Sequence, residues 1–140
     1  MLVLDANILI RAVLGVRVSS IIHKFAPKTA LLAPVSAFEE ARYSLPRIVQ
    51  RRNMPVLTAM AALESLEVLV HPVELRTFAA FELVARQLIR VRDEKDWPVL
   101  ASALALGCPI WTEDTDFFGC GVATWTTDRV ERFLDATSEP

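Results

Sequence analysis

Two residue types that commonly build structural sites are scarce in this sequence. It contains two cysteines, Cys108 and Cys120, which are too few for the disulfide framework of a small secreted domain. We therefore expect both to be reduced thiols. The two histidines, His23 and His71, stand alone, so the His-rich and Cys-rich spacings of a zinc site are missing. We expect both histidines to have structural or surface roles.

Long apolar runs and an excess of basic residues are also missing. No apolar run reaches the roughly 20 residues that a membrane-spanning helix needs. The first residues lack the basic segment, apolar stretch and cleavage site of a signal peptide, so we expect a cytoplasmic protein without a membrane segment. With 15 basic and 17 acidic residues the net charge is −2, so any contact with nucleic acid needs a local basic patch.

Short apolar runs alternate with helical patterns along the chain. The 140 residues, of which 53% are hydrophobic, predict one domain spanning residues 1–140 with a substantial core. This alternation predicts an α/β fold, a three-layer sandwich whose central parallel sheet of four to five strands is covered by helices on both faces. We expect strands at Met1–Leu4, Ala30–Val35, Glu67–Val70, Pro109–Thr112 and Val122–Trp125.

The helices are predicted from apolar spacing and from their start and stop residues. Ser36 with Glu39 three residues later has the form of a capping box, and Pro46 predicts a break or kink in the helix that follows. The other expected helices are one after Asp5 that Gly15 interrupts, and Val18–Phe25, Val56–Leu66, Glu74–Arg92, Trp97–Leu106 and Thr127–Ala136.

Acidic residues gather at one predicted edge of the sheet. They follow strands or open helices at Asp5, Glu39, Glu40, Asp96, Asp114 and Asp116. Ligands of parallel sheets bind at the carboxyl ends of the strands, so we expect these carboxylates to converge. Each has a structural explanation as well: Asp5 and Asp96 can cap helices, Glu39 fits the capping box, and Asp116 can form an Asx turn.

Clustered carboxylates need compensation. Two like charges about 4 Å apart repel by roughly 4 kcal/mol at an effective dielectric constant of about 20. Protonation, salt bridges or a hard cation can relieve that repulsion, and Mg²⁺ and Mn²⁺ prefer oxygen ligands. A metal held in this way can activate water for attack on a phosphodiester.

Three segments of the chain, which begin at residues 2, 36 and 96, are LVLDANILIRAVL, SAFEEARYSL and DWPVLASALALGCPIWTEDTDF. They resemble the motifs of the PIN domain, the nuclease module of VapC-type toxins in toxin–antitoxin pairs. The last contains an Asp that opens an Ala-rich helix, then Gly, an apolar strand, Thr-x-Asp and Asp-Phe. The sixteen positions from Asp96 to Thr112 fit the family pattern.

The resemblance implies a ribonuclease that depends on Mg²⁺ or Mn²⁺, acts on RNA, pairs with an antitoxin and forms a homodimer. Glu39 remains an alternative to Glu40, and Asp93 is a further candidate beside Asp96. The resemblance implies catalytic roles for Asp5, Glu40, Asp96 and Asp114, metal ligation by Asp5, Asp96, Asp114 and Asp116, and orienting roles for Asn7 and Thr112.

Two questions about partners stay open at this point. A basic stripe at Arg42, Arg47, Arg51 and Arg52 is a candidate RNA-binding surface, and its alternative is a solvated helix face. A PIN fold can also serve as a catalytically weak interaction module that binds RNA or a protein. The presence of all four catalytic acids favours the nuclease, whether it is a toxin or another PIN-type enzyme.

Overall fold

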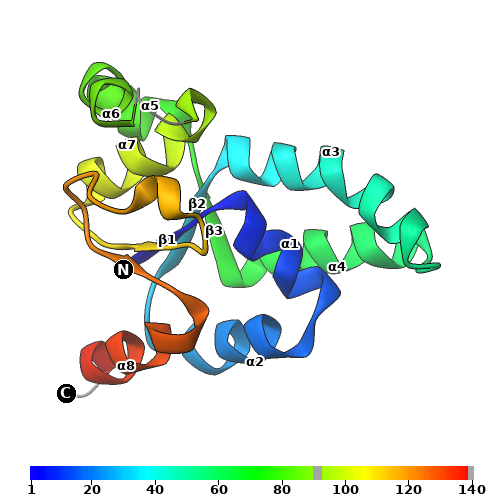
Figure 1. The fold of residues 1–140 in the computed structure, drawn as a ribbon. Helices are drawn as coiled ribbons and strands as arrows, with labels where there is room; N and C mark the ends of the chain where they lie inside the picture. Colours follow the sequence, from blue (N-terminus) through cyan, green and yellow to red (C-terminus); the bar gives the residue numbers. More distant parts are fainter. Residues whose placement is uncertain (90–92, 139–140) are drawn as a thin grey trace.

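The structure is a computed structural model that describes residues 1–89 and 93–138 (Figure 1). Its described residues form one parallel sheet with the strand order β3-β2-β1-β4-β5. The predicted parallel sheet of four to five strands is therefore confirmed. The strands are β1 (Leu2–Leu4), β2 (Leu31–Pro34), β3 (Val70–Val73), β4 (Ile110–Trp111) and β5 (Thr124–Trp125).

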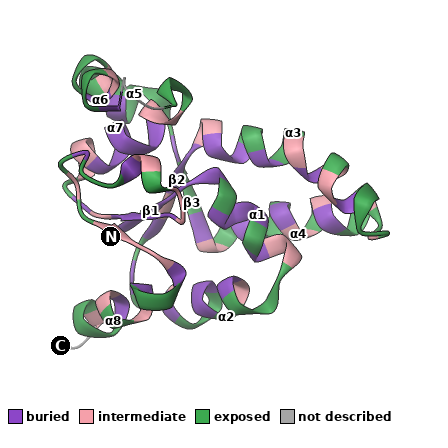
Figure 2. Cartoon of the chain, viewed as in Figure 1, coloured by how far each residue is buried: buried purple, intermediate pink, exposed green. Residues whose placement is uncertain are grey.

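Both faces of the sheet are covered by helices, which gives the predicted three-layer α/β/α arrangement. Strand β1 is buried throughout: Leu2 and Leu4 pack in one core, and Val3 packs in the other (Figure 2). The first core contains residues of α1 (Ala6–Leu14), α2 (Val16–Phe25), α3 (Val35–Arg51), α4 (Val56–Leu69) and α8 (Thr127–Ser138). The second contains residues of α5 (Leu75–Phe78), α6 (Glu82–Ile89) and α7 (Trp97–Leu106).

The order of the strands reverses at β1. Leu2 and Val3 pair with β2 on one side, while Val3 and Leu4 pair with β4 on the other. A crevice forms at the carboxyl ends of the strands at such a reversal. The residues that follow β1 and β4 therefore lie where a ligand site is expected, and Asp5 is the first of them.

The helix after β2 differs from the prediction at its start and in its middle. Ser36 is not the N-cap, because α3 begins at Val35 directly after Pro34, whose extended backbone has φ −61° and ψ 148°. Pro34 offers no side-chain hydrogen bond to cap this end of the helix. Pro46 does not break α3, which continues to Arg51 and buries Leu45 and Val49 on its way.

The boundary between α4 and β3 lies three residues later than predicted. Leu66 is buried on the helix, which continues to Leu69, so the strand begins at Val70 rather than at Glu67. Pairing with β2 sets this position, because Leu31 lies opposite Val70. Strand β3 stands at the edge of the sheet, where Pro72 is tolerated.

The predicted helix Glu74–Arg92 is wrong as one continuous element. It is divided into α5, a 3₁₀ turn at Ala79–Phe81, and α6, while residues 90–92 lie outside the described part of the chain. The first division falls at Phe78, whose φ of −119° and ψ of 0° leave the helical region. Its buried ring packs edge-on against Trp97, with the ring centroids 5.6 Å apart.

The remaining elements follow the prediction within a few residues. Gly15 separates α1 from α2, and Gly107 ends α7 in a left-handed conformation with φ 64°. Cys108 and Cys120 are buried free thiols. Among the described residues, no helix combines the length and the apolar character that crossing a membrane requires.

Candidate metal centre

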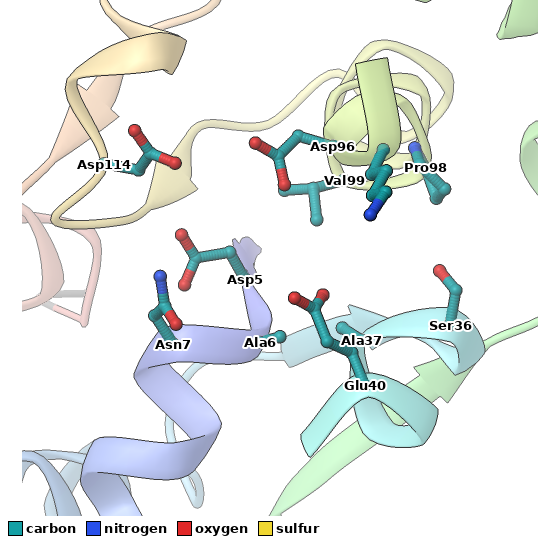
Figure 3. A pocket seen from close by; sticks show the side chains of 11 residues that line it. Asp5, Ala6, Asn7, Ser36, Ala37, Glu40, Asp96, Pro98, Val99 and Asp114 are labelled. Atoms are coloured by element: carbon teal, nitrogen blue, oxygen red, sulfur yellow. The ribbon is translucent and has the colours of Figure 1, made fainter. Parts of the chain in front are cut away.

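Four acidic side chains from four separate segments line one small cavity (Figure 3). It has a volume of about 80 Å³ and lies at the carboxyl end of β1. Asp5 follows β1, Glu40 comes from α3, Asp96 precedes α7, and Asp114 follows β4. The convergence expected from the sequence is therefore observed for these four acids, although none of their catalytic roles follows from position alone.

Two hydrogen bonds hold the carboxylate of Asp5 in place. One of its oxygens, Oδ1, accepts the backbone N–H of Ile8 at 3.0 Å and caps α1, while Oδ2 accepts a hydrogen bond from the hydroxyl of Thr112. The Thr112 hydroxyl also accepts the backbone N–H of Asp114 at 2.9 Å. Thr112 thus links the ends of β1 and β4.

Burial dominates the electrostatics of Asp5. Only 4% of the residue is exposed, and its burial raises the pKa of the carboxyl to about 6. The hydrogen bonds from Thr112 and Ile8 lower the pKa, and the charges of Asp114 and Glu40 raise it. Asp5 therefore both caps its helix and faces a cavity with other acids, so its two interpretations are compatible.

Asp96 does not use its side chain as a helix cap. It occupies the N-cap position of α7, but it makes no side-chain cap hydrogen bond. Burial raises the pKa of Asp96 to about 7, with further increases from Asp93, Asp114, Asp5 and Glu40. Its carboxyl remains directed to the cavity, where other acids surround it (Figure 3).

Asp93 has the local role that was considered for Asp96. Its side chain is exposed and accepts the backbone N–H of Lys95 at 3.0 Å, which caps the 3₁₀ turn Glu94–Asp96. Asp93 is not part of the cavity wall, but its charge raises the pKa of both Asp96 and Glu40. Asp93 therefore influences the acids of the cavity through its charge, without lining the cavity itself.

Three carboxylates lie close enough to share one cation. Single oxygens of Asp96, Asp114 and Asp116 all lie within 4.8 Å of one another. Asp114 also accepts the backbone N–H of Asp116 at 2.9 Å, which caps the 3₁₀ turn Thr115–Phe117. We call Asp96, Asp114 and Asp116 the acid trio; Asp5 lies on the cavity wall outside it.

The adjacent residues Glu39 and Glu40 line different cavities. Glu40 lines the cavity, whereas Glu39 lines a separate groove with Leu75 and Trp97. Burial raises the pKa of Glu40, the charge of Asp93 raises it further, and Lys95 lowers it. On a helix, adjacent residues point in different directions, which explains the separation.

Two polar residues beside the acids complete the cavity wall. Asn7 lies in the first turn of α1, next to Asp5, as the resemblance suggests. Lys95 also lines the cavity and was not identified from the sequence. The sequence offered one signal for Lys95: it is the single basic residue in the acidic run Asp93–Asp96, where it can balance the charge of the acids.

The predicted arginine stripe does not form one free surface. Arg42 is ion-paired with Glu67. Arg47 lies over the ring of Tyr43, 4.7 Å from its centroid, and donates a hydrogen bond of 2.6 Å to its hydroxyl. Arg51 and Arg52 are exposed at the end of α3, and neither lies on the wall of the acid cavity.

The donor set fits a hard divalent cation. The acid trio offers only carboxylate oxygens, the ligand type that Mg²⁺ and Mn²⁺ prefer. The raised pKa values of Asp5 and Asp96 reflect carboxylates held in a poorly solvated place beside like charges. A bound cation reverses this electrostatic cost, because it favours the ionised form of each acid.

Comparisons with known proteins agree with this geometry. Residues 3–135 match a family model described as the PIN domain, and this span includes every acid of the cavity. No curated protein matches the chain significantly. PIN domains are generally nucleases, and those nucleases typically use divalent metals.

Proposed function

Since this chain belongs to the PIN-domain family, we propose that it is an endoribonuclease that hydrolyses phosphodiester bonds of RNA with Mg²⁺ or Mn²⁺. The observation that supports this proposal is the meeting of Asp5, Glu40, Asp96 and Asp114 in one cavity at the point where the strand order reverses. Structural caps alone need no such meeting, and Asp96 makes no side-chain cap hydrogen bond.

The acid trio and Asp5 would hold the metal. Asp114 and Asp116 come from one turn and Asp96 from another, so a cation among them joins two segments of the chain. When bound, a divalent cation supplies a water of lowered pKa and stabilises the charge that develops on the phosphoryl oxygens. Thr112 keeps Asp5 in position through its hydrogen bond, and Asn7 is placed to orient a phosphate oxygen or water.

Glu40 has a different setting from the acid trio. It lies across the cavity on α3 and is exposed, so it can exchange protons with solvent. Although the residue as a whole is exposed, partial desolvation of its carboxyl and the charge of Asp93 raise its pKa, which is the direction that general acid–base catalysis by a carboxyl requires. We assign to Glu40 the transfer of a proton during hydrolysis rather than a main share of metal ligation.

Metal-dependent cleavage of RNA tests the proposal directly. The purified protein should cleave single-stranded RNA with Mg²⁺ or Mn²⁺, stop on addition of EDTA, and resume when excess Mn²⁺ is restored. Undiminished cleavage in EDTA would contradict a metal-dependent reaction. Folded, Mn²⁺-treated protein that cleaves no RNA would instead favour the catalytically weak interaction module.

We also propose that the enzyme is the toxin of a type II toxin–antitoxin pair and acts in the cytoplasm as a homodimer. The toxin role is supported by the resemblance of its motifs to VapC-type toxins. Dimerisation is supported by apolar side chains on α5 and α6, where Leu75, Leu83, Val84 and Leu88 are 57%, 75%, 47% and 45% exposed.

Two measurements address these roles separately. Expression of the chain should arrest growth, and co-expression of a neighbouring gene for a cognate antitoxin should relieve the arrest. Light scattering at micromolar concentration should give the mass of a dimer. A monomeric mass would contradict the homodimer without bearing on cleavage.

A further inference from the structure

A second and much larger cavity adjoins the acid cavity. Its volume is about 1050 Å³, against about 80 Å³ for the acid cavity, and Asn7 and Asp114 line both. A polymer bound in the small cavity must continue outside it, and the larger cavity adjoins it at Asn7 and Asp114.

One face of α1 forms a path between the two cavities. Asn7, Ile10, Arg11 and Leu14 all line the larger cavity, and their spacing places them on a single helical stripe. Arg11 lies about 6 Å farther along the helix axis than Asn7. The stripe therefore begins at the acids and leads to a region where apolar side chains lie beside Arg11, Arg17 and Arg52. The acids Glu113, Asp114 and Asp128 line the same cavity.

Among the described residues, three arginines line the larger cavity, and they differ in their ion pairing. Arg17 is paired with Asp128 at 2.9 Å, and Glu113 accepts the backbone N–H of Thr127 at 2.6 Å. Within residues 1–89 and 93–138, Arg11 and Arg52 make no ion pair, and both are exposed. Arg11 belongs to α1 and Arg52 directly follows α3, and both line the same cavity.

We propose that this cavity binds the single-stranded part of the RNA that extends away from the cleaved bond. We call it the arginine groove and define it by Arg11, Arg52 and the apolar residues Ile10, Leu14 and Ile48. Arg11 and Arg52 bind phosphates, and the apolar residues contact bases. This inference rests on the proposed ribonuclease function, since it assigns the path of that enzyme's substrate.

Two arginines without an ion pair in the described residues, Arg11 and Arg52, are the reason that the occupant is a polyanion. The acid cavity repels phosphates, and the whole chain has a net charge of −2, so the attraction for RNA must come from nearby cations. Arg42 and Arg47 of the predicted stripe already contact Glu67 and Tyr43. Arg11 and Arg52, which have no acidic partner in the described part of the chain, lie instead in a groove that adjoins the acid cavity.

The salt dependence of RNA binding tests the groove without requiring cleavage. A labelled single-stranded RNA of about 12 nucleotides, within the usual range of such sites, is titrated in EDTA with wild type, Arg11→Glu and Arg52→Glu. The plot of log affinity against log salt should become shallower by about 0.7 for each phosphate that the variant no longer neutralises. Arg11→Gln repeats the test in case a glutamate in the last turn of α1 disturbs the helix.

A matched control separates local contacts from net charge. Arg132→Glu makes the same charge change at an exposed position of α8 that does not line the groove. This variant should keep the wild-type salt slope. Arg51→Glu, one residue from Arg52, distinguishes the groove from a general effect of the end of α3.

Cleavage kinetics in Mn²⁺ give a second readout. Arg11→Glu and Arg52→Glu should each raise KM for the RNA by about tenfold, the loss expected for a charge-assisted hydrogen bond, and leave kcat within about twofold. Wild-type slopes in both Arg11 variants and in Arg52→Glu would overturn the groove even if the enzyme cleaves RNA. Wild type that cleaves no RNA would overturn the proposed function, while the salt slopes still decide the groove.

Discussion

The two acidic runs of this protein have the same local structure but different relations to the cavity. In the run Asp93–Asp96, the first aspartate accepts the N–H of Lys95 at 3.0 Å. In the run Glu113–Asp116, Asp114 accepts the N–H of Asp116 at 2.9 Å. Each bond caps a 3₁₀ turn. Asp93, however, is exposed outside the cavity wall, whereas Asp114 lines the cavity.

This difference shows that capping a turn does not determine whether an aspartate lines the acid cavity. In the first run the acid at the end of the turn, Asp96, enters the cavity, while in the second run the cap itself does. The first run precedes α7, and the second follows β4 beside the reversal of strand order. Tertiary position therefore decides which acid of a run can contact a metal, and the predictions below test that distinction.

The largest expected effect comes from making one substitution at both caps. Asn caps as well as Asp, so Asp93→Asn and Asp114→Asn should both keep their turns and the fold. Cleavage of RNA should fall by roughly a thousandfold in Asp114→Asn, the scale of losing a key electrostatic group, and by less than about threefold in Asp93→Asn. Initial rates in saturating Mn²⁺, with circular dichroism as a folding check, give the comparison. Equal losses in both variants would mean that the two caps are equivalent after all.

A second pair applies the same reasoning to adjacent glutamates. Glu40 lines the acid cavity and Glu39 lines the groove beside Trp97. Glu40→Gln should lower kcat by about a hundredfold, as expected for lost proton transfer, and Glu39→Gln should leave it nearly unchanged. Measured kcat values for the two variants decide between the positions. A larger loss in Glu39→Gln would reverse the assignment.

Thr112→Val should have a smaller effect, because Thr112 holds a proposed metal ligand in position and is not a ligand itself. The substitution removes the hydroxyl that donates to Asp5 and accepts from the N–H of Asp114, while it keeps a similar shape. Loss of such an orienting group typically weakens metal binding by about 10- to 100-fold, so we expect a Mn²⁺ dissociation constant raised by that factor. Calorimetric titration measures it. Thr112→Ser keeps the hydroxyl and should bind Mn²⁺ like the wild type.

The smallest effect is on stability without metal. In the folded protein, the pKa of Asp5 is raised from 3.8 to about 6 and that of Asp96 from 3.8 to about 7. Between the ordinary and the raised pKa of each acid, the folded protein therefore binds more protons than the unfolded chain. Stability from these two acids is therefore full below about pH 4 and is lost as the pH rises to about 7. In EDTA the Tm should therefore fall between pH 5 and pH 8, by roughly 4 °C for each kcal/mol of stability that is lost.

Variants and metal provide the control for that pH dependence. Asp96→Asn should flatten the fall in Tm, because an amide does not titrate, while Asp93→Asn should retain most of it. Mn²⁺ binds the deprotonated carboxylates, so the increase in Tm that it causes should grow from pH 5 to pH 8. A rise in Tm that is the same at both pH values would show that these acids do not bind the ion.

Most of the fold was predictable because the local sequence patterns agree with the tertiary packing of the same segments. Strand β1 is three apolar residues ending at an aspartate, and α7 is an apolar helix that stops at a glycine with φ 64°. Where they disagreed, the prediction was wrong. Ser36 and Glu39 have the form of a capping box, but Pro34 is already the last strand residue and the helix begins directly after it. The predicted helix Glu74–Arg92 divides at Phe78, which packs on a ring that is distant in the sequence.

The sequence by itself determined which residues could act: the acids, their order, and the short strands and turns that present them. A strand that ends in an aspartate and a turn capped by one are local features, set by propensity and by hydrogen bonds between near neighbours. Only the tertiary structure decided that Glu39 lines a different cavity from Glu40 and that Asp93 stays outside the acid cavity. It also decided that Arg42 is ion-paired while Arg11 lines the arginine groove. These outcomes depend on how whole helices are oriented against the sheet, because neighbouring residues of one helix or turn point to different surroundings.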